Sequence, residues 1–154
     1  MSNRKIKRRV GDVVAVPISE GRRSFAIVLD EPTIAFFDIL TTNDRTPSPG
    51  DMLNSRELFR LWVMNHAIER GTWPVVSHTR VPPHMLTPQP FFKQDPISGK
   101  LSITTNGADE EPASRAQCLG LERAAVWDPR HIVDRLEDHF SGRENKWLES
   151  LRLK

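Results

Sequence analysis

The first part of the chain alternates short apolar runs with turn residues. Apolar side chains dominate residues 12–18 (DVVAVPI), 22–30 (RRSFAIVLD) and 33–40 (TIAFFDIL). The linking segments "SEG" and "EP" are typical of tight turns. Three short strands joined in this way predict an antiparallel meander. Phe36 and Phe37 are adjacent in the third strand, so their side chains should lie on opposite faces of the sheet.

The middle of the chain continues this β-rich pattern with interruptions. Residues 41–52 are polar and contain two prolines and a glycine, so they predict a surface loop. Residues 57–68 (ELFRLWVMNHAI) fit either a helix or a strand, and we favour a strand because their apolar side chains resemble those of a fully buried one. Residues 74–81 and 99–107 predict two further strands.

Five prolines fall within residues 82–98. Because each proline removes a backbone donor, this segment should not be a regular internal strand. We expect it to cross the surface of the sheet as an extended, stiff segment, with Phe91 and Phe92 covering an edge. Residues 108–118 are predicted to form a loop.

The C-terminal part has helical character. Asp128 followed by Pro129 is typical of a helix start, since the carboxylate caps free N–H groups and proline suits the first helical position. Gly142 suits the position just after the helix. The residues between them place four apolar side chains on one face at helical spacing: Ile132, Val133, Leu136 and Phe140. Residues 144–154 predict another helical turn or two, anchored by Trp147.

These elements predict a mostly β fold of the α+β class. We expect a small antiparallel β-barrel, or a strongly curved sheet, with a docked C-terminal helix. Residues 1–9 should form a basic flexible arm, and residues 10–154 a single domain that is β-rich over 10–107 and helical over 121–154. A chain of 154 residues is long enough to bury a core of that kind.

Composition narrows the class of protein. Hydrophobic residues make up 38% and charged residues 27%, which is typical of a globular domain. No apolar run is long enough to span a membrane, and no apolar region follows the basic start as in a secretory signal. A single cysteine, Cys118, cannot form an internal disulfide and fits a reducing compartment. We therefore expect a cytoplasmic protein without a membrane partner.

The net charge of +2 conceals an asymmetry. Residues 4–9 carry five basic groups and no acidic ones, and the rest of the chain has 17 basic against 20 acidic residues. A basic arm can contact nucleic acid or another acidic surface, but a solvated arm is the commoner case. The body of the protein is mildly acidic.

The sequence contains no motif for catalysis, a cofactor or a metal. It lacks HExxH, a phosphate-binding glycine loop and the cysteines of a zinc finger. Cys118 lies among apolar residues without a basic neighbour, so we expect a buried structural thiol. We accordingly predict no enzyme activity, no cofactor and no metal. A hydrolase using His78, His84 and Asp38 is a third alternative, and it requires these residues to converge in one pocket.

Two stretches resemble a known family. Residues 10–39 (VGDVVAVPISEGRRSFAIVLDEPTIAFFDI) resemble the opening of the immunity protein 26 family, with its glycine-aspartate start and "IAFFD"-like strand. Residues 71–86 (GTWPVVSHTRVPPHML) resemble its tryptophan-containing turn followed by a strand and prolines. The resemblance covers residues 10 to about 100. It implies a mostly β fold and a cytosolic antidote that binds a cognate toxin of a bacterial polymorphic or contact-dependent inhibition system, often a nuclease.

The resemblance and the acidic body together predict an acidic partner-binding surface. The candidate residues are Asp134, Glu137 and Asp138 on the C-terminal helix, Asp109, Glu110 and Glu111 in the loop 108–118, and Asp44. The alternative function is a nucleic-acid-binding small β-barrel, in which residues 4–9 with Arg22 and Arg23 would contact phosphates.

Overall fold

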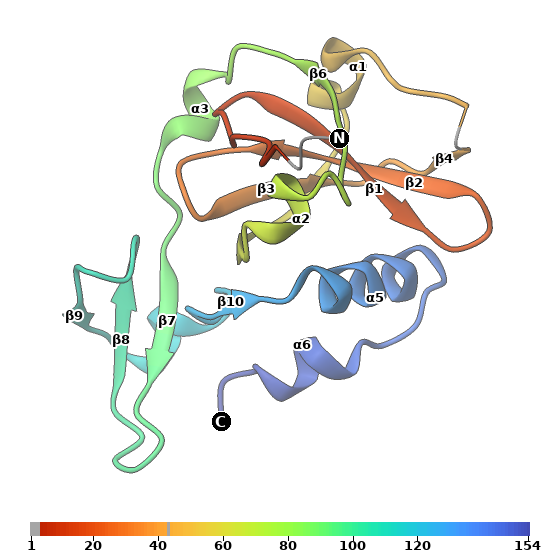
Figure 1. Ribbon diagram of the computed structural model, residues 1–154. Coiled ribbons are helices and arrows are strands. Elements are labelled where there is room, and N and C mark those ends of the chain that lie inside the picture. Colours follow the sequence, from red (N-terminus) through yellow and green to blue (C-terminus); the bar gives the residue numbers. More distant parts are fainter. Residues whose placement is uncertain (1–3, 43) are drawn as a thin grey trace.

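The computed structural model describes residues 4–42 and 44–154, and a strongly curved sheet dominates it (Figure 1). Its strands follow the order β10-β5-β3-β2-β1-β6, with β4 beside β2. The strands are β1 (Asp12–Ile18), β2 (Arg22–Val28), β3 (Thr33–Phe37), β4 (Thr41–Thr42), β5 (Glu57–Val63), β6 (Val75–His78) and β10 (Val126–Trp127). A second sheet has the order β7-β8-β9, with β7 (Phe91–Gln94), β8 (Leu101–Thr104) and β9 (Glu111–Pro112).

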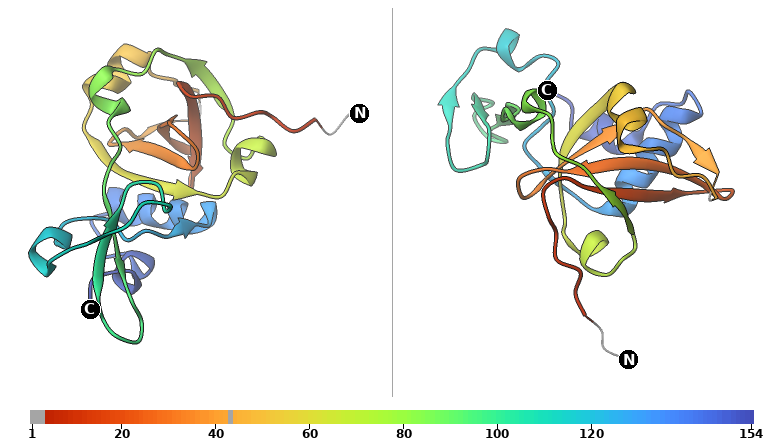
Figure 2. Two further views of the ribbon diagram at one scale, coloured as in Figure 1. Left: turned by 90° about the vertical axis from the view of Figure 1, so that its left-hand side faces the viewer. Right: turned by 90° about the horizontal axis from the view of Figure 1, so that it is seen from above.

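Six helices accompany the two sheets in the described part of the chain. They are α1 (Pro49–Asn54), α2 (His66–Glu69), α3 (Pro83–Leu86), α4 (Arg115–Cys118), α5 (Pro129–Phe140) and α6 (Lys146–Ser150). In Figure 2, α5 and α6 lie outside the curve of the main sheet, while α1 and α3 lie along its rim. None of the helices described here is long and apolar enough to cross a membrane.

The predicted meander is confirmed, because β1, β2 and β3 pair in antiparallel order. The strand predicted over residues 57–68 is confirmed only for residues 57–63, because residues 66–69 form the helix α2. Two features differ from the prediction of a small antiparallel barrel. β10 pairs with β5 in parallel, and no ladder joins the end strands β6 and β10 among the described residues. The structure therefore shows a curved sheet rather than a closed barrel.

Both faces of the central strands are buried. On one face, alternate residues of β1 to β3 pack against α5 and against two tryptophans, Trp73 and Trp127. On the other face, the intervening residues pack against side chains of α1 and α3. Phe36 and Phe37 divide between the two clusters, as their adjacent positions predict. The rings of Trp73 and Phe36 pack edge to face, with centroids 5.7 Å apart.

The C-terminal helix α5 begins and ends as the sequence predicts. The side chain of Asp128 accepts a hydrogen bond from the backbone N–H of Arg130 at 2.8 Å, with Pro129 at the first helical position. Ser141 is the C-cap, and Gly142 follows with φ of +70°. Trp147 of α6 is partly buried against the same core.

Arg135 anchors α5 to the sheet in a way that the apolar pattern does not reveal. It is only 7% exposed, and its guanidinium donates two hydrogen bonds to Glu122 at 2.8 and 3.0 Å. The guanidinium carbon lies 3.8 Å from the ring centroid of Phe59 and 5.3 Å from that of Trp127. An ion pair and two cation–π contacts thus hold one buried charge.

Three segments contain more regular structure than predicted. The proline-rich residues 82–98 include α3 and β7, and the whole of β7 falls between two prolines. Phe91 and Phe92 are buried in that strand instead of covering an edge from outside. The expected loop 41–52 contains β4 and the start of α1, and the expected loop 108–118 contains β9 and α4.

Gly11→Ala should lower the free energy of unfolding. The added Cβ would lie 2.3 Å from the carbonyl oxygen of Thr79, at a backbone φ of +94°. We expect a loss of about 3 kcal/mol in urea denaturation, because a positive φ and a backbone clash both oppose alanine. Gly99→Ala is the matched control: φ there is +75° but no atom lies within 4 Å, so it should cost only about 1–2 kcal/mol. Equal losses would contradict the close approach at Gly11.

Glu122→Ala should also destabilise the fold strongly. It leaves the buried Arg135 guanidinium without its carboxylate, and breaking a buried pair in this way costs about 3 kcal/mol or more. Glu149→Ala removes the exposed pair with Arg152, which has an N–O distance of 3.0 Å, and should cost less than about 1 kcal/mol. Thermal or urea unfolding measures the loss of stability in both variants. Similar losses would show that the buried Glu122–Arg135 pair contributes no more than an exposed pair.

Candidate partner-binding site

The three carboxylates predicted on α5 are engaged within the protein. Asp134 accepts a hydrogen bond from Trp147 Nε1 at 3.0 Å, and Glu137 accepts one from the backbone N–H of Ser19 at 2.9 Å. Asp138 accepts a hydrogen bond from the side-chain amide of Asn145, also at 2.9 Å. These bonds tie α5 to α6 and to the turn between β1 and β2. These carboxylates, predicted to bind a partner, thus have a structural use within the protein.

Asp109 closes the turn between β8 and β9. Its carboxylate accepts hydrogen bonds from the backbone N–H groups of Thr105 and Asn106 and from the hydroxyls of Thr104 and Thr105. These four bonds hold the pKa of Asp109 well below its usual range. The turn is therefore organised around an ionised carboxylate.

The remaining predicted carboxylates have different surroundings. Glu110 accepts hydrogen bonds from Ser102 and Lys93, and these lower its pKa. Asp44 accepts one from Thr42, which lowers the pKa of Asp44. Glu111 is exposed and has no side-chain hydrogen bond within the described ranges. Figure 1 shows β4, α5 and β9 in three separate parts of the molecule, so the seven predicted residues do not form one surface.

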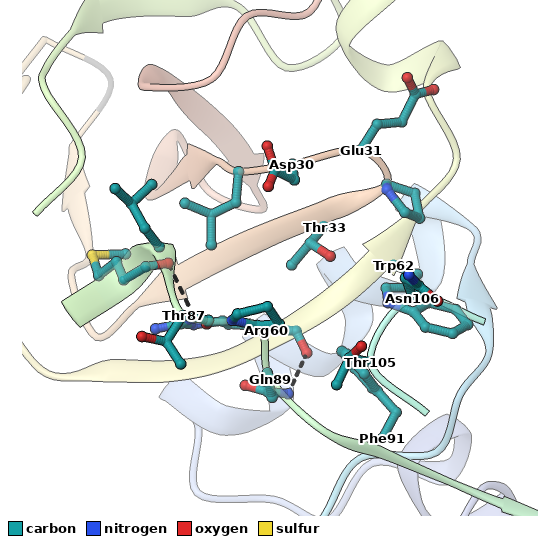
Figure 3. Close-up of a pocket in the computed structure, with 15 residues that line it drawn as sticks. Asp30, Glu31, Thr33, Arg60, Trp62, Thr87, Gln89, Phe91, Thr105 and Asn106 are labelled. Atoms are coloured by element: carbon teal, nitrogen blue, oxygen red, sulfur yellow. Dashed lines mark hydrogen bonds between the residues drawn. The ribbon is translucent and has the colours of Figure 1, made fainter. Parts of the chain in front are cut away.

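A pocket of about 210 Å³ lies where the two sheets meet (Figure 3). Four segments form its walls: the turn between β2 and β3, strand β5, the chain from α3 to β7, and the turn after β8. Apolar side chains provide much of the lining: Leu29, Pro32, Trp62, Met85, Leu86, Pro88 and Phe91. This pocket is the feature that sequence reasoning missed. Its sequence signals are the "DEP" turn and the proline-rich segment, which the fold brings together.

Arg60 fixes one wall of the pocket. Its Nε donates to Glu57 at 3.0 Å, and its Nη1 donates to the carbonyl oxygens of Met85 and Thr87 at 3.3 and 3.2 Å. Gln89 Nε2 in turn donates to the carbonyl oxygen of Arg60 at 3.4 Å. The segment after α3 is thereby held against β5 by one side chain and its backbone.

Trp62 lines the pocket next to the second sheet. Its ring packs against Phe91 with centroids 4.9 Å apart. The side chain is largely buried, and its indole N–H has no hydrogen-bond acceptor within residues 4–42 and 44–154.

The basic arm contacts the body next to the pocket. Arg8 donates hydrogen bonds to the carbonyl oxygens of Leu29 and Thr33, on both sides of the "DEP" turn, and to Asn65. Burial lowers the pKa of Arg8, while the charges of Glu31 and Asp30 oppose that shift. Residues 1–3 of the predicted arm 1–9 lie outside the described residues, and residues 4–9 include at least one side chain with a defined position.

The residues of the hydrolase alternative do not pair with one another. His78 Nδ1 lies 3.0 Å from Asp12, and His139 Nε2 lies 3.0 Å from Asp38. No group of three or more His, Cys, Asp or Glu side chains in the described part of the chain is placed to hold a metal ion. Cys118 is 1% exposed, which confirms the predicted buried thiol.

These features define a scaffold with a pocket between two sheets, and comparison with known proteins places it in a family. The family model for immunity protein 26 matches residues 9–102, which is more than half of the chain. The chain belongs to the immunity protein 26 family, and the general role of immunity proteins is to neutralise toxins. No curated protein and no solved structure matches it.

Asp109→Ala should destabilise the protein in a pH-dependent way. A carboxylate whose pKa is lowered in the folded state stabilises the fold fully above its unfolded pKa, near 4 for aspartate, and loses that contribution as the pH falls further. The difference in unfolding free energy between wild type and variant should therefore be largest at neutral pH and shrink below about pH 4. Glu111→Ala is the control and should change stability little. A pH-independent difference for Asp109→Ala would contradict this reading of the turn.

Proposed function

We propose that this protein neutralises one cognate toxin by binding it directly, without catalysis of its own. The observation that carries the proposal is the family match over residues 9–102. That range contains the whole curved sheet apart from β10, and three of the four pocket walls. An inhibitor of this kind needs a rigid scaffold and a complementary surface, and a sheet buried on both faces supplies the rigidity.

The acidic body favours a toxin with a basic surface, such as a nuclease. Outside residues 4–9 the chain has 17 basic and 20 acidic residues. Complementary charge speeds association and disfavours wrong partners. Among the predicted carboxylates, Asp109 and Glu111 suit this role best, because both are exposed and Asp109 stays ionised. Asp109 also accepts hydrogen bonds from Thr105 and Asn106, which line the pocket. A cytoplasmic location fits an antidote that protects the producing cell.

The contacts of the arginines do not favour the nucleic-acid alternative. Arg8 binds two backbone carbonyls, and Arg23 donates to the carbonyl oxygen of Arg45 and the hydroxyl of Thr46. Arg23 also lies 5.3 Å from the ring of Phe25. Arginines that contact phosphates need free guanidinium donors, and these are partly used within the protein.

Co-expression with the toxin encoded beside its gene tests the proposal. We expect the protein to restore growth of cells that produce the toxin. Calorimetry should detect a complex between the protein and the purified toxin. The association rate should fall as salt is raised, because opposite charges steer the encounter. Absence of both protection and complex formation would reject the proposed function, and a salt-independent association rate would reject the basic toxin surface.

A further inference from the structure

The pocket between the two sheets joins an apolar lining to an acidic rim. Leu29, Met85 and Phe91 line it together with Trp62, and Leu86 lies at its edge with 56% exposure. Asp30 and Glu31 stand on the turn above this lining in Figure 3. Pockets for small molecules usually have volumes above about 300 Å³. A volume of about 210 Å³ suits one long side chain better than a whole metabolite.

The acidic rim forms no ion pair among the described residues, although Arg8 lies close enough for its charge to act on Asp30 and Glu31. Arg60 forms its ion pair with Glu57, and Arg8 donates to carbonyl oxygens and Asn65. The carboxylate of Asp30 has no hydrogen bond or ion pair among the described residues. Glu31 accepts one hydrogen bond, from the neutral amide of Asn65. The two carboxylates thus have one arginine nearby, and neither is held in an ion pair with it.

The geometry points to a socket for a lysine or arginine side chain that protrudes from the toxin. The methylene stem packs on the apolar lining, and the charged end meets the carboxylates of the turn, Asp30 and Glu31. Long basic side chains combine an apolar stem with a charged end, and arginine is common among residues that dominate binding. This inference rests on the proposed function and assigns its docking surface.

Leu86→Arg blocks the socket by placing a cation at its edge. Leu86 is exposed, so the variant should keep the unfolding midpoint of the wild type. We expect toxin binding to weaken roughly thirty-fold or more, the scale of a central interface residue. Ile97→Arg is the matched control, because Ile97 is 96% exposed in the hairpin between β7 and β8 and outside the pocket. It should bind the toxin as the wild type does.

Asp30→Asn tests the charge alone. Loss of a charge-assisted contact should weaken binding about tenfold and reduce its salt dependence. Glu144→Gln is the control, since Glu144 is exposed on the connection between α5 and α6. A double-mutant cycle then pairs Asp30→Asn with replacement of each surface lysine and arginine of the toxin by methionine. One basic position should couple to Asp30 by about threefold or more in affinity.

The outcomes separate this inference from the function on which it rests. A wild-type protein that fails to bind the toxin overturns both. Normal toxin binding by the wild type and by both Leu86→Arg and Asp30→Asn overturns the socket alone. Weakened binding by Leu86→Arg, with no basic toxin position that couples to Asp30, overturns the basic occupant.

Discussion

Burial of both faces of the central strands is the constraint on which the rest of the structure depends. β1, β2 and β3 carry almost unbroken apolar runs, so neither face can be left in water. One face requires α5, and the other requires α1 together with α3. The short helices and proline-rich segments between strands are therefore covers for the sheet. The pocket lies where one of those covers, the chain from α3 to β7, passes between β5 and the second sheet.

Arginine side chains connect the covers to the sheet. Arg8, Arg60 and Arg123 each donate to two backbone carbonyl oxygens in other segments. Arg135 makes the comparable connection through Glu122. A guanidinium has five donors in a fixed plane, so one side chain can satisfy several loop carbonyls at once. Several arginine side chains thus make contacts within the protein. The number of basic residues is therefore not evidence of affinity for nucleic acid.

The sequence predicts the strands and α5 well because their signals are local. Period-two and period-3.6 patterns, turn residues and the Asp128–Pro129 start all act within a few positions. The prediction is poorer for residues 82–98, since the prolines leave just enough unbroken chain for β7. α4 has a capping box formed by Ser114 and Gln117, a local signal that could have been recognised. The pocket could not be predicted, because it joins residues about 75 positions apart.

The pocket also separates two kinds of constraint along the chain. Three of its four walls come from a turn, a proline-rich connection and a second turn, while the apolar residues that stabilise the fold lie mainly in strands and in α5. Exposed wall positions such as Leu86 and Asp30 can change without altering those buried clusters. A scaffold of this kind can acquire a new partner by substitutions at its pocket while it keeps its stability. Recognition and folding are then free to evolve at different rates.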